Sequence, residues 1–235
     1  MTGFGRPHRH LAECASTNDI AREWASDALD PAPSGALMTA DFQTRGRGQR
    51  GHQWQAEAGR SALMSYVYRL PPDADPAQLG FVAALAVTEV CRASQSAAQI
   101  KWPNDVLLNG KKVAGILVEV TGSVAIIGIG INVSQTEFAG AAEYAYPPTS
   151  LKLEEAEEQT VRRVIKMLNR HLSWWEEEWR RKGFTPILER CRTCLAVGAR
   201  VCQGEVTAEL VWLTDEGAAR VRLPDGTFAV WTTVG

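Results

Sequence analysis

Residues 39–65 read TADFQTRGRGQRGHQWQAEAGRSALMS, a glycine- and arginine-rich loop between two apolar segments. Its small and cationic residues are Gly46, Gly48, Gly51, Arg45, Arg47 and Arg50. Glycine tolerates positive φ, so successive backbone N–H groups can point into one concavity that binds an anion. Arginine adds a forked donor suited to carboxylate and phosphate groups. The loop therefore predicts a site for a negatively charged ligand, and a solvated surface loop is the alternative that its composition alone allows.

The apolar segments on either side of this loop predict two strands, at residues 35–42 and 62–70. Two more strands are predicted at residues 113–120 and 124–131, after a hairpin signal at Asn109-Gly110. The fold is therefore expected to contain a sheet on which the glycine- and arginine-rich loop is mounted.

Three glycines lie inside the second pair of predicted strands. Gly115 interrupts one of them, and Gly128 and Gly130 alternate in the other. Alternate residues of a strand share a face, so the last two glycines remove side chains from a single patch. A flat apolar ligand on this patch is one interpretation, and close packing of a helix on the sheet is the other.

Residues 100–105 read IKWPND and precede a short apolar run. Because the Trp-Pro pair interrupts strand pairing, Asn104 and Asp105 are expected to project at a kinked strand end. Lys112 follows the hairpin turn at the start of the next strand. These polar groups are candidates for a site near the loop.

Four segments are predicted to be helical, at residues 16–30, 75–90, 160–183 and 186–194. The first opens with Ser16-Thr17-Asn18-Asp19, a typical N-cap signature. These polar residues either cap the helix or bind the polar head of a ligand at its N-terminus. From residue 197 onward, short apolar runs separated by turn residues predict four or five strands, the size of a small barrel.

The composition excludes several classes of protein. The chain has 235 residues, a formal charge of -2 and a pI of about 6.1, which favours neither a nucleic-acid partner nor a membrane surface. No stretch reaches the length of about 18 apolar residues that a membrane span requires, and the first residues do not resemble a signal peptide, so a cytoplasmic location is expected. The five cysteines are odd in number and scattered, which predicts reduced thiols rather than a disulfide framework. Cys191 and Cys194 lack a fourth ligand at the spacing of a zinc site, so a metal site is not expected there.

Taken together, the motifs resemble the catalytic part of biotin protein ligases, which attach biotin to a lysine of a carrier protein. They are STN at residues 16–18, the GRG loop with Trp54 downstream, KWPND at 101–105, KVAGILVE at 112–119 and GIGIN at 128–132. The resemblance implies an α+β fold, with a mixed β-sheet flanked by helices as in class II aminoacyl-tRNA synthetases, followed by a small SH3-like barrel. It implies a catalytic domain at residues 1–190 and the barrel at 191–235.

The resemblance also implies roles for individual residues. Biotin would contact Ser16, Thr17, Asn18, Gln43, Arg47, Gly48, Gln49, Lys112, Gly115, Gly128 and Gly130. The nucleotide would contact Arg47, Arg50, Trp54, Asn104, Lys112 and Asn132. Catalysis would involve Lys112, Arg47, Arg50 and Asp105, and Asp105 would also lie near a Mg²⁺ ion.

The activity implied is a ligation in two steps, with ATP and biotin as substrates and Mg²⁺ as the metal. Biotin is first converted to biotinyl-5′-AMP with release of pyrophosphate, and the biotinyl group then passes to a biotin carboxyl carrier protein of a carboxylase. The oligomeric state is left open, with a homodimer as one candidate. No nucleic-acid or membrane partner is expected.

Two departures from the family pattern qualify this expectation. The usual loop of the family reads GRGRxGR, whereas this chain has Gln49 and His52 at two of the arginine positions. Only 15 residues precede Ser16, and no helix-turn-helix fits them, so the repressor activity of some family members is expected to be absent.

Two rival functions remain at this stage. A lipoate or octanoyl transferase attaches a different acyl group to a similar carrier but lacks the pairing of a GRG loop with KWPND. A non-catalytic biotin-binding protein would have no need for Lys112 and Asp105, which this chain retains.

Overall fold

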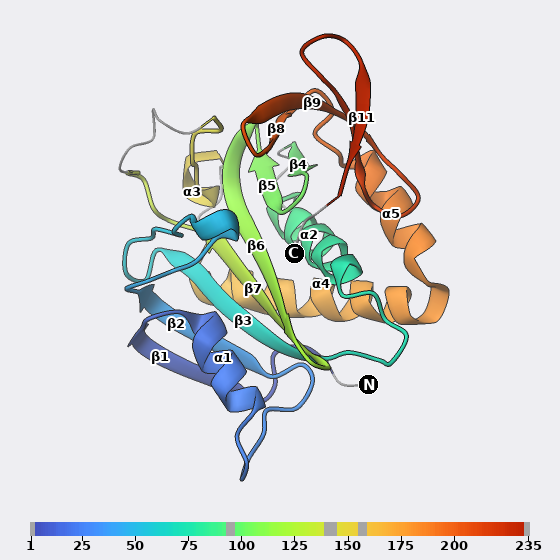
Figure 1. The fold of residues 1–235 in the computed structure, drawn as a ribbon. Coiled ribbons are helices and arrows are strands. Elements are labelled where there is room, and N and C mark those ends of the chain that lie inside the picture. The colour runs from blue at the N-terminus through green and yellow to red at the C-terminus, as the bar shows by residue number, and fades with distance from the viewer. Residues whose placement is uncertain (1–2, 93–96, 139–144, 155–158, 233–235) are drawn as a thin grey trace.

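The computed structural model describes residues 3–92, 97–138, 145–154 and 159–232. They form a seven-stranded mixed sheet with helices on both faces, followed by a smaller four-stranded antiparallel sheet (Figure 1). This confirms the predicted α+β class with a mixed sheet flanked by helices. Within the described ranges, no helix is long and apolar enough to cross a membrane.

The secondary structure follows the predicted order. The large sheet consists of β1 (His8–Cys14), β2 (Leu37–Gln43), β3 (Ser61–Arg69), β4 (Ala98–Lys101), β5 (Asp105–Leu108), β6 (Lys111–Thr121) and β7 (Val124–Asn132). The helices are α1 (Thr17–Ala25), α2 (Ala77–Cys91), α3 (Leu151–Glu154), α4 (Val161–Lys182) and α5 (Phe184–Thr193), with a 3-10 turn η1 (Gln49–Gly51) in the loop. The small sheet consists of β8 (Arg200–Gln203), β9 (Val206–Leu213), β10 (Ala219–Arg222) and β11 (Phe228–Trp231).

The strand order of the large sheet is β1-β2-β3-β7-β6-β5-β4, and only the pairing of β1 with β2 is parallel. Strand β1 was not predicted. Nearly all its side chains are exposed, so its sequence lacks the alternation of apolar and polar residues that reveals a half-buried strand. The hairpin between β5 and β6 was predicted correctly, and Asn109 and Gly110 both have the positive φ that such a turn requires.

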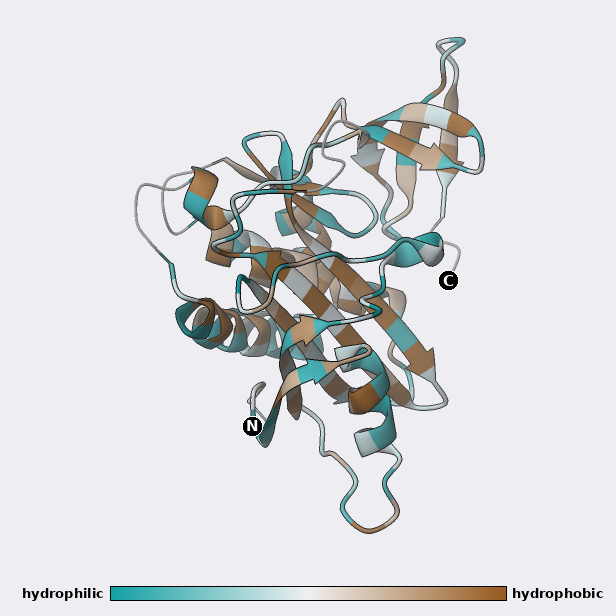
Figure 2. Cartoon of the chain, turned by 90° about the vertical axis from the view of Figure 1, so that its left-hand side faces the viewer, coloured by the Kyte–Doolittle hydropathy of each residue, from teal (hydrophilic) through white to brown (hydrophobic). Residues whose placement is uncertain are grey.

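The two faces of the sheet have different coverings. On β7, Ile127, Ile129 and Ile131 belong to the main core, which also contains the buried sides of α2 and α4. Ile126 faces the opposite side and packs with Trp24 of α1 in a smaller cluster. Figure 2 shows the central strands largely in hydrophobic brown. On this face α1 packs against β2, β3 and β7.

The helix boundaries test the capping predictions. Thr160 accepts a hydrogen bond from the Arg163 N–H (3.2 Å), and Gly183 ends α4 at a φ of 78°, as predicted. Helix α1 stops at Ala25, short of the expected residue 30. Ser16 is the N-cap residue, as the signature indicates, but its side chain makes no capping hydrogen bond within the described chain.

The C-terminal sheet has the strand order β11-β10-β9-β8. Four strands agree with the prediction, but no pairing joins β8 to β11 in the described part of the chain, so the closed SH3-like barrel is not confirmed. The sheet packs on the rest of the molecule, because Leu210 and Val221 belong to the same core as Ile187 of α5. Trp102 also donates a hydrogen bond to the Gly217 carbonyl (3.2 Å), which ties the KWPND segment to this sheet.

Candidate functional site

A cavity of about 490 Å³ lies between the glycine-bearing strands, the loop at η1, the KWPND segment and β8. Every residue that the sequence assigned to the site lines this cavity except Asn132. Those present are Ser16, Thr17, Asn18, Gln43, Arg47, Gly48, Gln49, Arg50, Trp54, Asn104, Asp105, Lys112, Gly115, Gly128 and Gly130. The fold therefore gathers into one cavity residues that are far apart in the sequence.

The floor of the cavity is set by strand register. Asp105 of β5, Gly115 of β6, Gly130 of β7 and Leu63 of β3 are paired in one row across four strands. Paired residues of antiparallel strands point to the same face, so two adjacent glycines expose bare backbone in the middle of this row. Gly128 lies in the next row, paired with Ser65 on one side. The glycines thus form one continuous patch without side chains.

Two side chains lie directly over this patch. A Cβ atom at Gly130 would lie 2.6 Å from Cε2 of Trp54, and one at Gly115 would lie 3.0 Å from Cζ3 of the same ring. A Cβ atom at Gly128 would lie 2.4 Å from Oδ1 of Asn18. At Gly128 the neighbouring side chain belongs to α1, which agrees with close packing of a helix on the sheet, whereas at Gly115 and Gly130 the neighbour is the loop residue Trp54. The glycines make room for an indole and an amide that themselves line the cavity.

One end of the cavity is a network of neutral polar groups. The Gln43 Oε1 atom accepts hydrogen bonds from the Thr17 N–H (2.7 Å) and hydroxyl (3.0 Å), so Gln43 rather than Ser16 satisfies the start of α1. Ser65 Oγ lies 2.8 Å from Thr17 Oγ1 and 2.5 Å from Asn18 Oδ1. Thr17, Asn18 and Ser65 are all buried. This end can recognise a neutral ligand group that both donates and accepts hydrogen bonds.

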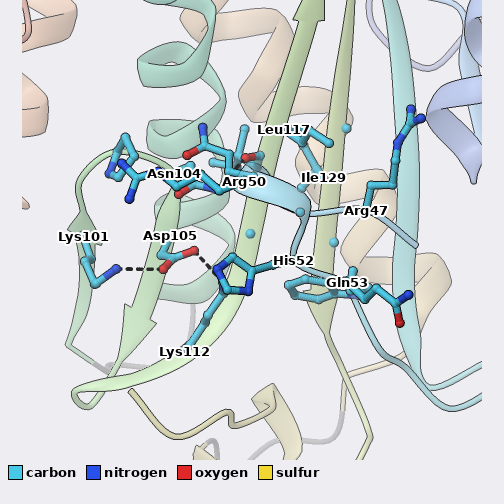
Figure 3. Close-up of a pocket in the computed structure, with 18 of the residues that line it drawn as sticks. Arg47, Arg50, His52, Gln53, Lys101, Asn104, Asp105, Lys112, Leu117 and Ile129 are labelled. Carbon is cyan, nitrogen blue, oxygen red and sulfur yellow. Dashed lines mark hydrogen bonds and ion pairs between the residues drawn. The ribbon is translucent and has the colours of Figure 1, made fainter. Parts of the chain in front are cut away.

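The other end carries charge (Figure 3). Asp105 lies between two ammonium groups, with Lys112 Nζ 2.6 Å from Oδ1 and Lys101 Nζ 3.0 Å from Oδ2. Burial raises the pKa of Asp105, but the two lysines outweigh burial and leave the pKa below its ordinary value. Asp105 is thus an anion at neutral pH, and the group of three has an excess positive charge available to a ligand. The KWPND motif alone does not predict the contact of Lys101 with Asp105, because that contact depends on the pairing of β4 with β5.

The geometry gives little support to Asp105 as a metal ligand. Both of its carboxylate oxygens already face ammonium groups, and a divalent cation would compete with them. No group of three or more His, Cys, Asp or Glu side chains in the described ranges could hold a metal ion. The residues present therefore do not fit a protein-built Mg²⁺ site, and the metal role of Asp105 remains only a prediction.

The loop arginines line the cavity, but their guanidinium groups are bound to the protein itself. Arg47 reaches away from Lys101 and Asp105 toward α1 (Figure 3), where Nη2 lies 2.8 Å from Asp19 and 2.9 Å from Glu119. Arg50 has a positive φ of 56° and donates from Nη1 to the Cys202 carbonyl (2.7 Å). Direct contact of either arginine with phosphate, as the sequence predicted, would require these bonds to be exchanged.

The other predicted residues divide between the cavity and the core. Asn104 donates to the Ile116 carbonyl (3.1 Å) at the edge of the cavity. Asn132 is buried outside the lining, where its amide is satisfied by Ser61 (3.2 Å) and the Thr149 carbonyl (2.9 Å). Its predicted contact with the nucleotide has no support from this position. Gln49 and His52, the two departures in the loop, both line the cavity.

The C-terminal sheet contributes to the cavity, which the sequence did not predict. Arg200, Cys202 and Thr207 line it from β8 and β9, and the Arg200 N–H donates to the hydroxyl of Tyr146 (2.6 Å), another lining residue. None of these residues belongs to a recognisable motif. Only the packing of the two sheets reveals them.

The cavity as a whole suits an elongated ligand with three parts: a neutral head that hydrogen-bonds, a flat apolar body and an anionic end. Trp54 adds a buried indole N–H that has no partner among the described residues, so it can donate to a ligand oxygen. Lys112 is close enough to the ring, 5.9 Å from its centroid, for a cation–π contact.

Comparison with known proteins identifies a family whose model matches this chain and relatives that resemble it. The model of the biotin/lipoate A/B protein ligase family matches residues 12–135. The chain is 35% identical over 231 residues to the biotin acetyl-CoA-carboxylase ligase of Paracoccus denitrificans, with 92% of this chain and 94% of that protein covered. It is 34% identical over 228 residues to the bifunctional ligase/repressor BirA of Bacillus subtilis, with 90% and 68% covered.

The fold is similar to the biotin protein ligase of Aquifex aeolicus solved in complex with biotin and ATP, with a TM-score of 0.82 and 26% identity over 97% of this chain and 96% of that one. A biotin protein ligase of Leishmania major in complex with biotinyl-5-AMP matches with a TM-score of 0.66 and 25% identity, over 97% and 99% of the two chains. Since the family model spans more than half of the sequence, and a ligase of nearly equal length shares a third of its residues, the chain belongs to the biotin/lipoate A/B protein ligase family.

Proposed function

We propose that this protein is an ATP-dependent biotin protein ligase that forms biotinyl-5′-AMP and transfers the biotinyl group to a lysine of a carboxylase carrier protein. The observation that carries the proposal is one cavity with a neutral polar end at Thr17 and Asn18, a glycine floor, and an ammonium end at Lys112. Biotin has these three parts, since a cyclic urea is joined through an apolar ring and chain to a carboxylate.

In the first step, an oxygen of the biotin carboxylate attacks the α-phosphorus of ATP. The bond from this phosphorus to the bridging oxygen breaks, and pyrophosphate leaves with the electron pair. This chemistry depends mainly on positioning and on cations near the developing charge. Lys112 and Lys101 are the ammonium groups at the reacting end, and their excess charge over Asp105 remains available to the phosphates.

In the second step, a lysine amine of the carrier attacks the carbonyl carbon of the mixed anhydride, the bond to the phosphate oxygen breaks, AMP leaves with the electron pair, and the amine nitrogen loses one proton to water. Asp105 is a poor general base for this amine, because its pKa is held below the ordinary value. Its role is to hold the two ammonium groups in place. A carrier lysine that arrives as the free amine then needs only a positioned anhydride that is protected from water.

Three finer assignments complete the proposal. Mg²⁺ would be held mainly by the ATP phosphates and would offset part of their charge, since proteins commonly bind this ion through substrate phosphates together with one or two carboxylates. Residues 1–190 form the catalytic domain, and 191–235 form an SH3-like domain that closes one side of the cavity. The contacts of Arg200 and Cys202 with the cavity support a part for the second domain in both steps.

The family also contains lipoate ligases, so the acyl group needs a direct test. Purified protein is incubated with ATP, a biotin carboxyl carrier domain, and either biotin or lipoate, and the carrier is analysed by intact-mass and peptide mass spectrometry. We expect one biotinyl group on a single lysine and no lipoyl product. A lipoyl adduct formed at an equal or higher rate, or a carrier left unmodified with biotin, would contradict the proposal.

A further inference from the structure

The KVAGILVE motif on β6 ends in an acidic residue, Glu119, which lies beside the cavity lining. Glu119 accepts from the Asn18 amide, with Nδ2 2.7 Å from Oε2. The same oxygen lies 2.9 Å from Arg47 of the loop and 2.9 Å from Arg22 of α1. One carboxylate atom therefore joins the polar end of the cavity to the loop that borders it.

Asp19 completes this cluster. Its Oδ1 atom lies 2.8 Å from Arg47 and 3.0 Å from Arg22, so two arginines and two carboxylates balance each other. In the described part of the chain, the Asn18 amide donates to Glu119 and not to Asp19, which separates the roles of the two carboxylates. The Glu119 side chain is 29% exposed, so its charge is partly screened but not lost to solvent.

The contacts of Asn18 show what Glu119 does to the ligand end. A carboxylate only accepts hydrogen bonds, so Glu119 requires the NH₂ side of the amide to face it. The oxygen side then faces Ser65, 2.5 Å away, and lies over Gly128. The orientation of the amide is fixed from both sides before any ligand arrives.

We propose that Glu119 is a positioning residue that couples the orientation of Asn18 to the position of the loop through Arg47. A ligand bound at the polar end contacts Asn18, and the Asn18 amide is hydrogen-bonded to Glu119. Glu119 in turn forms an ion pair with the Arg47 guanidinium of the loop. Loss of the Glu119 carboxylate removes the contacts with both Asn18 and Arg47. Loss of the Asp19 carboxylate removes a contact with Arg47 but none with Asn18. The expected effect on biotin binding rests on the proposed function. The expected effect on the loop rests only on the contacts within the protein.

The test uses four variants of the full chain: Glu119→Ala, Glu119→Gln, Asp19→Asn and Glu89→Ala. Glu89 is a matched control, since its side chain is 26% exposed and pairs with Arg190, and neither residue lines the cavity. Circular dichroism and thermal melting establish that each variant is folded. The first readout, without any substrate, is the rate of limited tryptic cleavage after Arg45, Arg47 and Arg50. The second readout is the Kd of biotin by calorimetry.

We expect Glu119→Ala to speed cleavage of the loop several-fold and to weaken biotin binding by about tenfold, the effect of losing one hydrogen bond to a charged group. Glu119→Gln retains an acceptor for Asn18, so it should speed cleavage while keeping the Kd within about threefold. Asp19→Asn should also speed cleavage and leave the Kd unchanged, and Glu89→Ala should change neither.

Two results would overturn the inference. Equal loop cleavage in Glu119→Ala and Glu89→Ala would mean that Glu119 does not hold the loop. Faster cleavage with an unchanged Kd in Glu119→Ala would mean that it does not position Asn18. If the wild type fails to bind biotin at all, the proposed function fails, but the cleavage rates still report on the hold of Glu119 over the loop.

Discussion

The two ends of the cavity are built on different principles. At the polar end, Thr17, Asn18, Ser65 and Gln43 satisfy one another through neutral hydrogen bonds in a buried setting. At the charged end, two ammonium groups share one carboxylate, which leaves a net charge of +1 from two positive charges and one negative. A network of satisfied hydrogen bonds selects a ligand by its shape and hydrogen-bonding pattern, while an excess positive charge attracts and stabilises an anion. Recognition and reaction are thus separated along the cavity.

The largest effect is expected from removing the cation at the charged end. Lys112→Ala should lower biotin-dependent pyrophosphate release by about 100- to 1,000-fold, the range for a lost group that stabilises transition-state charge. Lys111→Ala is the matched control, because Lys111 is adjacent in sequence but pairs with Glu154 outside the lining. Pyrophosphate release within a few-fold of wild type in Lys112→Ala would refute this role.

The next effect concerns the polar end. In Gly128→Ala the new methyl group meets the Asn18 amide at 2.4 Å, so the amide must leave its bonds to Ser65 and Glu119. We expect biotin to bind about 10- to 100-fold more weakly, the cost of one or two hydrogen bonds in a buried site. Calorimetry measures this, with Gly80→Ala on α2 as the control because a Cβ atom there has open space. An unchanged Kd in Gly128→Ala would show that Asn18 does not contact the ligand.

A smaller effect should follow when the loop is detached from the C-terminal sheet. Arg50→Ala removes the bond to the Cys202 carbonyl, worth about 1 kcal/mol, or roughly a fivefold change in an equilibrium. We expect faster loss of biotinyl-5′-AMP from the enzyme, measured after gel filtration without carrier. The control is Arg45→Ala, since Arg45 lies in the same loop but outside the cavity lining. Equal release rates in the two variants would mean that the contact with the C-terminal sheet does not help to retain the intermediate.

The smallest effect is a pH dependence. The pKa of Asp105 is lowered on folding from its ordinary 3.8, so its ion pairs stabilise the fold above that pH and lose their effect as the pH falls. Chemical unfolding between pH 5 and pH 3 should therefore show a steeper loss of stability in the wild type than in Asp105→Asn. Parallel curves would mean that the two lysines do not stabilise the carboxylate.

The sequence revealed most of the fold because the buried strands and α4 have clear apolar periodicity and marked ends, such as Thr160 and Gly183. It missed β1, whose exposed side chains have no pattern, and the closure of the predicted barrel is not confirmed. Most of the residues that the motifs predicted line the cavity, but the motifs did not predict the lining residues from β8 and β9. They did not reveal Ser65 or Glu119, because those contacts arise from strand register and from a helix that packs across the sheet.

The central claim is that this one cavity joins a biotin carboxylate to the α-phosphate of ATP. Isotope exchange tests it without a carrier: the enzyme is given ATP, labelled pyrophosphate and either biotin, lipoate or no acid, and label entering ATP is measured. We expect rapid exchange with biotin, very slow exchange with lipoate, and none without acid. Binding of biotin and ATP without exchange, or faster exchange with lipoate, would contradict it.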